Sequence, residues 1–282
     1  MAYLSEVAVV AIDFIIEYDC VPKRRLTPEG ILERIKEKER AQTVMQWFRE
    51  AGDERPPSEM GFEFSRSAPD EQASKQLIVV QDLLDHAAAL DAHAHHCSAC
   101  PANRSGSPFG CMGFIQYPIS AQTEAWLLDR LPVPDEPLVW LLLKQGIQRL
   151  GYDGSSIRAL RELDSQNEAG ERAYFMASEA PQRRLGELRV TGDQALEMIF
   201  GVGDRIIPNH AGILLLFFGA IDRDLEAAEI QEISSFDRTI REGFTFEMEA
   251  VSTGHEGIRE IISFFHALYL AWKLDVSLFV DA

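Results

Sequence analysis

Apolar residues form two kinds of pattern along this chain, and the two kinds alternate. Short runs rich in valine, isoleucine and aromatic residues are typical of β-strands. The sequence predicts such strands at residues 4–18, 61–67, 114–119, 173–180, 211–221, 243–251 and 276–280. The run at 211–221, AGILLLFFGAI, carries no charge, so we expect it to be a buried strand.

Longer segments, with apolar residues three or four positions apart, predict helices between these strands. They cover residues 27–49, 70–93, 121–131, 136–150, 191–200, 222–233 and 255–273. Three of them begin at a residue that commonly caps a helix, namely Thr27, Ser120 and Thr191. The alternation of strands and helices predicts an α/β or α+β fold.

The two halves of the sequence share short segments in the same order. PKRRL-TPEGILERI (22–35) matches PQRRL-GELRV-TGDQALEMI (181–199) when five residues are inserted in the second copy, and GFEF (61–64) matches GFTF (243–246). We therefore expect two pseudo-repeated strand–helix halves. Chance similarity of such short segments is the alternative.

The duplication predicts a domain organisation. The first half covers residues 1–132, a helical connector covers 133–164, and the second half covers 165–282. In the second half the long helix meets its strand almost directly. The same junction in the first half carries a cysteine- and histidine-rich insertion within residues 93–113.

The charge of the chain limits its partners. It has 45 acidic and 27 basic residues, which give a net charge of −18 at pH 7. Such a surface repels nucleic acids and anionic membranes, so we expect neither as a partner. A protein partner and a small molecule both stay open.

The N-terminal segment lacks the basic region of a secretory signal. The longest uncharged apolar run has 11 residues, well short of the roughly 20 that span a bilayer. The four cysteines do not form the pattern of a secreted disulfide framework. We therefore expect a cytoplasmic protein with reduced thiols.

The segment HAHHCSACPANRSGSPFGCMG (93–113) holds three of the four cysteines and three of the seven histidines. Cys97 and Cys100 are separated by two residues, so both thiolates can hold one cation in a tight turn. Cys111 supplies a third thiolate from the loop that follows. Zinc takes four ligands, and three cysteines with one histidine are a common structural set.

The fourth ligand of such a site is a histidine. On a helix, His93 lies one turn before Cys97 and projects from the same face, so it is the expected ligand. His96 is the alternative, and His95 is the third choice. His86 lies on the same predicted helical stripe, where we expect a core histidine rather than a ligand.

Zinc is the expected cofactor, and an iron–sulfur cluster is the alternative because it uses the same residue types. A redox dithiol and incidental buried thiols also stay open. Zinc held by four protein ligands has no open position and is structural. With only three protein ligands, a bound water could be activated for catalysis.

The remaining histidines and the arginine pairs are weaker candidates. We expect a solvated or capping role for His210, a capping role for His255 and a core position for His266. Two arginine pairs occupy matching places in the two halves, and they predict either surface ion pairs or an anion clamp. These are Arg24 with Arg25 and Arg183 with Arg184.

The sequence contains no phosphate-binding glycine loop, nucleophile elbow or HExxH pattern, and no carboxylate spacing selects an acid–base pair. Whether the protein is an enzyme is therefore left open. Our hypothesis is a cytoplasmic interaction or regulatory protein with a structural zinc. The alternatives are an iron–sulfur protein and a metal-dependent enzyme, hydrolytic or redox, that uses the Cys/His site or the cleft between the halves.

Overall fold

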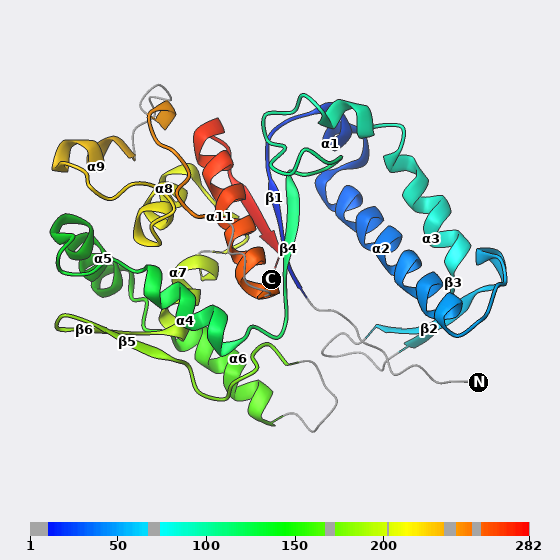
Figure 1. Ribbon diagram of the computed structural model, residues 1–282, viewed down its shortest axis with the longest axis horizontal. Helices are drawn as coiled ribbons and strands as arrows, with labels where there is room; N and C mark the ends of the chain where they lie inside the picture. Colours follow the sequence, from blue (N-terminus) through cyan, green and yellow to red (C-terminus); the bar gives the residue numbers. More distant parts are fainter. Residues whose placement is uncertain are drawn as a thin grey trace. The chain divides into compact units, whose positions relative to one another are not determined.

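The computed structural model describes residues 11–66, 74–166, 173–201, 203–233, 241–249 and 255–281. These residues form two compact units. The first unit contains Asp19–Phe109, and the second contains residues 11–18 together with the described residues from Gly110 onward. Figure 1 shows the elements of both units. The units group the chain differently from the predicted divisions 1–132, 133–164 and 165–282, which stay predictions.

The first unit consists of helices and one β-hairpin. In chain order its elements are α1 (Val21–Leu26), α2 (Pro28–Glu50), the 3-10 turn η1 (Pro57–Glu59), β2 (Gly61–Arg66), β3 (Ser74–Val79), α3 (Val80–Ala87), and the 3-10 turns η2 (Ala88–Leu90) and η3 (Ala94–Cys97). Strands β2 and β3 pair in antiparallel register, with Gly61 opposite Val79.

Helix α2 begins where the sequence predicts it. The hydroxyl of Thr27 accepts a hydrogen bond from the backbone N–H of Gly30 at 3.0 Å, and Pro28 occupies the first helical position. Helix α2 packs on α3, and apolar side chains fill the space between them and the hairpin. The buried residues of this hydrophobic cluster are Ala41, Val44, Met60, Val80 and Leu83. The first unit therefore has a small core of its own.

The second unit holds the larger set of elements. They are β1 (Ala11–Ile16), β4 (Met112–Gln116), α4 (Ala121–Arg130), α5 (Pro137–Leu150), α6 (Ser155–Gln166), β5 (Gln182–Leu185), β6 (Leu188–Thr191), α7 (Gly192–Phe200), β7 (Arg205–Ile206), α8 (Pro208–Phe217), α9 (Ala227–Ile233), α11 (Glu256–Leu274) and β8 (Leu278–Asp281). Strands β5 and β6 form a hairpin of their own.

The second unit contains a four-stranded sheet in the order β4-β1-β8-β7. All its neighbouring strands are antiparallel. Helix α11 packs against β4, β1 and β8 (Figure 1), and Phe14 of β1 meets Phe264 of α11 edge to face, with 5.4 Å between the ring centroids. Antiparallel pairing with helices packed on the sheet is an α+β arrangement, which agrees with the predicted mixture of helices and strands.

Two helices of the second unit also begin at predicted caps. The hydroxyl of Ser120 accepts a hydrogen bond from the N–H of Thr123 at the start of α4. At the start of α7, Thr191 and Gln194 form a reciprocal capping box. These local signals placed the helices correctly.

The prediction for residues 211–221 was wrong, because most of this apolar run is in helix α8. Pro208 stands at the first helical position, and the residues from Leu214 to Phe217 are all buried. A helix that is apolar on every side has no amphipathic period, so its pattern cannot be distinguished from that of a buried strand.

The helix predicted at 70–93 was also wrong in its first part, because residues 74–79 form β3 and α3 ends at Ala87. The described residues of the predicted strands 173–180 and 243–251 form no strand, apart from an isolated bridge between Ile119 and Phe175. The strand predicted at 4–18 is present as β1 within the residues that are described.

The structure does not show the predicted duplication. The matched segments PKRRL and PQRRL adopt different conformations, since the first forms helix α1 and the second enters strand β5. Likewise GFEF lies in β2, whereas GFTF is in an irregular segment. Across the described ranges, no helix is both long enough and apolar enough to cross a membrane.

Candidate functional site

The predicted metal ligands are divided between the two units. His93, His96, Cys97 and Cys100 belong to the first unit, and Cys111 belongs to the second. The sulfur-bearing residues Cys97 and Cys111 are buried, whereas Cys100 is half-buried. In the part of the chain that the structure describes, no three histidine, cysteine or acidic side chains form a group that could hold a metal ion.

The geometry expected for His93 differs from the observed one. Because α3 ends at Ala87, His93 does not share a continuous helix with Cys97 and instead precedes the 3-10 turn η3. The rings of His93 and His96 lie 6.3 Å apart between centroids, and those of His95 and His96 lie 3.9 Å apart. The three predicted histidines are therefore neighbours in space.

Desolvation and this proximity both affect the protonation of His96. The pKa of His96 is lowered, first by desolvation and then by the adjacent imidazoles of His95 and His93. A lowered pKa favours the neutral ring, which is the form that binds metal ions. The neutral ring of His96 is therefore favoured, although it belongs to no metal-ligand group among the described residues.

A single asparagine organises the loop around the two cysteines. The Asn103 side-chain amide donates to the carbonyl oxygen of Cys97 at 2.8 Å and to that of Ser107 at 3.0 Å. Its backbone N–H donates to the carbonyl oxygen of Cys100 at 3.0 Å, and its side-chain oxygen accepts from the N–H of Gly106 at 3.1 Å. Asn103 was not among the predicted site residues, although Asn-x-Ser-Gly is typical of a turn.

Cys111 lies at the start of β4, where its carbonyl oxygen accepts a hydrogen bond from the N–H of Ile16 at 3.0 Å. Its position is therefore fixed by the sheet of the second unit. The thiols of Cys97 and Cys100 are free, and the backbone N–H of Cys100 donates to the carbonyl oxygen of Cys97 at 3.3 Å, which closes the turn between them.

A buried charge network joins three helices of the second unit. Arg161 of α6 donates to Glu124 of α4 at 2.6 Å and to Asp193 of α7 at 2.8 Å. It also donates to the carbonyl oxygen of Ala177 and lies over the ring of Phe175. The pKa of Glu124 is raised by burial, and the contacts with Arg161 oppose that rise. Because every charge has a partner, the network holds the helices together rather than presenting a reactive group.

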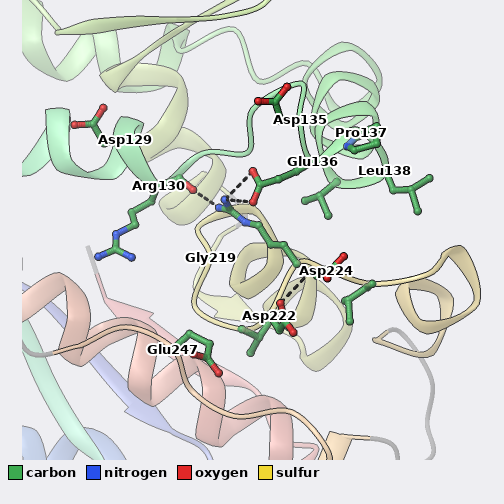
Figure 2. A pocket seen from close by; sticks show the side chains of 14 residues that line it. Asp129, Arg130, Asp135, Glu136, Pro137, Leu138, Gly219, Asp222, Asp224 and Glu247 are labelled. Atoms are coloured by element: carbon green, nitrogen blue, oxygen red, sulfur yellow. Dashed lines mark hydrogen bonds and ion pairs between the residues drawn. The ribbon is translucent and has the colours of Figure 1, made fainter.

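The second unit also contains a groove of about 810 Å³. It is lined by the end of α4 and the loop that follows, by the start of α5, and by the loop after α8 (Figure 2). We call it the acidic groove because six carboxylates line it. They are Asp129, Asp135, Glu136, Asp222, Asp224 and Glu247.

Arg223 fixes one wall of the acidic groove. Its guanidinium donates to Glu136 at 3.3 Å and to the backbone carbonyl oxygen of Arg130 (Figure 2). It also donates to the backbone carbonyl oxygen of Leu216. Burial lowers the pKa of Arg223, and the carboxylate of Glu136 opposes this shift. Gly219 is in the left-handed region at φ +60°, and a Cβ there would lie 3.0 Å from the guanidinium. The loop therefore wraps closely around this arginine.

The other candidate histidines make contacts within the protein. The core position predicted for His86 was wrong, because its side chain is 42% exposed and contacts the carboxylate of Glu37. His255, which precedes α11, is 3.0 Å from the side-chain amide of Gln122. His266 stacks on Phe246 with 4.9 Å between the ring centroids. None of these contacts forms a catalytic arrangement.

His210 lies in the first turn of α8, and its Nε2 is buried without a hydrogen-bond partner in the residues described. Burial lowers its pKa, and a hydrogen bond with the backbone of Met198 opposes this shift. The neutral form of the ring is therefore favoured. His210 was predicted to be solvated or to cap the helix, and the structure instead shows a half-buried residue whose Nε2 is shielded from solvent.

The arginine pairs make intramolecular contacts. Arg24 lies 3.5 Å from Asp19, and both side chains are exposed. Arg183 donates to the carbonyl oxygen of Leu128 at 2.8 Å, and Arg184 donates to that of Gly186 at 3.0 Å. Arg183 also lies 3.6 Å from Asp129, so one arginine of each pair forms an ion pair, as the first alternative predicts.

Comparison with known proteins adds no relative to this picture. No family model, no curated protein and no solved structure matches the chain. The function must therefore be argued from the site itself.

Proposed function

We propose that the chain is a cytoplasmic interaction or regulatory protein that binds one zinc ion through the segment 93–113. The observation that supports this proposal is the closed turn between Cys97 and Cys100, with three histidine rings beside one another in the same segment. Thiolates and imidazoles are the ligands that zinc prefers. An acidic, reduced-thiol protein fits the cytoplasm.

In this proposal Cys97, Cys100 and Cys111 supply three thiolates, and His93 or His96 supplies the imidazole. Ten residues separate Cys100 from Cys111, which is enough chain for both to reach one ion. Among the described residues these side chains do not form a preformed ligand group. Zinc binding would then be coupled to the ordering of the segment, as it is in small zinc domains.

Metal analysis of the purified protein tests the proposal. We expect a colourless protein with one zinc per chain, which is lost to a strong chelator together with thermal stability. Cys97→Ser and Cys111→Ser should each abolish stoichiometric zinc and lower the melting temperature. Cys20→Ser is the matched control, because Cys20 lies outside the segment, and it should retain the metal.

Three results would contradict the proposal. A brown protein that contains iron and sulfide would show that the segment binds an iron–sulfur cluster instead of zinc. A metal-free protein whose melting temperature does not respond to added zinc would show that the thiols have another role. Zinc that is retained in the Cys97→Ser and Cys111→Ser variants would place the ion elsewhere.

A further inference from the structure

The acidic groove of the second unit presents negative charge that the chain neutralises only in part. Two of its carboxylates are paired, Glu136 with Arg223 and Asp129 with Arg183, and Arg130 is a further cation in the lining. Within the described ranges, Asp135, Asp222 and Asp224 form no salt bridge, so acidic side chains still outnumber basic ones in the lining. From this arrangement we infer that the groove is a docking site for a basic, amphipathic segment of a partner protein. This inference concerns a different surface from the metal segment and does not depend on zinc.

The carboxylates of the groove are spread along its walls rather than gathered at a point (Figure 2). In the described parts of the chain, no three acidic side chains converge closely enough to hold a metal ion. A diffuse negative field of this kind attracts a ligand with several separated positive charges. A segment with several lysine or arginine side chains meets that requirement better than a single cation does.

The groove is also bordered by exposed apolar side chains. Leu138, at the start of α5, lines the groove and is 41% exposed, and Leu141, one turn along the same helix, is 46% exposed. Residues three positions apart lie on one face of a helix. Leu225, in the loop after α8, adds a half-buried apolar side chain to the lining. The partner segment therefore needs apolar residues between its basic ones.

Charge complementarity selects the kind of partner. The chain as a whole carries a net charge of −18, so a basic segment is attracted to it over a long range as well as in the groove. Apolar contact with Leu138 and Leu141 then supplies the attraction that salt does not screen. A second copy of this acidic chain would be repelled.

The test uses the full-length protein and a dye-labelled peptide of alternating lysine and leucine pairs. Fluorescence anisotropy should show binding that weakens as salt is added. A peptide with glutamate in place of lysine, a peptide with serine in place of leucine, and spermine should each bind at least about tenfold more weakly. Backbone amide shifts in NMR spectra should change at residues 129–141 and 219–225.

Charge reversal in the groove provides the decisive comparison. The double variant Asp135→Lys with Asp224→Lys should weaken peptide binding at least about tenfold. The matched control, Glu179→Lys with Glu232→Lys, changes the net charge equally at exposed positions outside the groove and should change binding by less than about threefold. Leu138→Ser should weaken binding without changing the charge, and urea unfolding confirms that each variant folds.

Four results would overturn the inference. Equal loss of binding in the two double variants would mean that net charge alone attracts the peptide. Spermine that binds as tightly as the peptide would indicate a small-cation site. Shift changes outside the groove would place the peptide elsewhere, and concentration-dependent dimerisation that is abolished by Leu138→Ser would show that a second copy occupies the surface.

Discussion

The guanidinium of Arg161 lies 2.6 Å from the carboxylate of Glu124, and both side chains are almost completely withdrawn from solvent. The same guanidinium contacts Asp193 at 2.8 Å, so one cation neutralises two buried carboxylates. These three residues come from α6, α4 and α7. The three helices therefore meet at one buried cation.

Replacing this cation should destabilise the second unit strongly. We expect Arg161→Met to lower the free energy of unfolding by about 3–5 kcal/mol, because it leaves buried carboxylates without a partner. Arg24→Met is the matched control. It breaks an exposed pair with Asp19 and should cost less than about 1 kcal/mol. Urea unfolding of both variants measures the difference, and equal losses would contradict the assigned role.

His210 should make stability depend on pH. Burial lowers the pKa of this histidine below the ordinary value of 6.5, so the unfolded chain binds the proton more readily than the folded one. Its contribution to stability is complete above about pH 6.5 and is lost as the pH falls through the lower pKa of the folded state. We therefore expect the free energy of unfolding to fall between pH 7.5 and 5.5.

The variant His210→Gln should lose less stability over the same pH interval than the wild-type protein. His255→Gln is the control, because His255 is exposed and precedes α11. It should keep the wild-type pH dependence. Chemical unfolding at several pH values measures all three proteins. If His210→Gln keeps the full pH dependence, the titrating group is another residue.

Two glycines inside helices should respond in opposite ways to alanine. A Cβ at Gly212 of α8 would lie 2.7 Å from Cγ2 of Ile233 and 2.9 Å from Nε1 of Trp272, which donates a hydrogen bond to the carbonyl oxygen of Ile233. We expect Gly212→Ala to cost about 1–3 kcal/mol through overpacking. A Cβ at Gly146 of α5 would make only ordinary contacts, with Phe217 at 3.5 Å.

Gly146→Ala should therefore leave stability unchanged or raise it by up to about 1 kcal/mol, since alanine favours helix more than glycine does. Thermal unfolding of the two variants provides the comparison. A loss at Gly146 as large as that at Gly212 would mean that neither effect comes from the space around the glycine.

Asn103 should protect the Cys97 thiol. Asn103→Ala removes two donated hydrogen bonds that hold the loop over the Cys97–Cys100 turn, so the buried thiol should react faster with a thiol reagent. Ser98→Ala removes only an exposed hydrogen bond to the carbonyl oxygen of His95 and serves as the control. Reaction rates measured in metal-free protein separate the two variants. Equal rates would contradict the role of Asn103.

The sequence predicted those parts of the fold that depend on neighbouring residues. The caps at Thr27, Ser120 and Thr191 each act within three residues, and all three helices begin where expected. Helix α8 was missed because it is apolar on all sides. Strand β3 was missed because its residues fit a helical stripe as well as a strand, and only pairing with β2 decides between them.

The candidate sites were predictable to different extents. The turn from Cys97 to Cys100 follows from their spacing, but the position of His93 depended on a helix that ends early, at Ala87. The acidic groove and the network around Arg161 unite residues that are far apart in sequence. No local sequence pattern predicts that these residues will meet, because they come together only when the helices pack.

The four-stranded sheet has a consequence for biosynthesis. Strand β1 precedes the segment Asp19–Phe109 of the first unit, yet its partners β4 and β8 come after that segment along the chain. As the ribosome produces the chain, Asp19–Phe109 can collapse on its own core while β1 still has two unpaired edges. One edge is satisfied when residues 112–116 emerge, and the other only when residues 278–281 do. The nascent chain therefore carries an open strand through most of its translation, which makes this interval the stage at which aggregation or chaperone binding competes with folding.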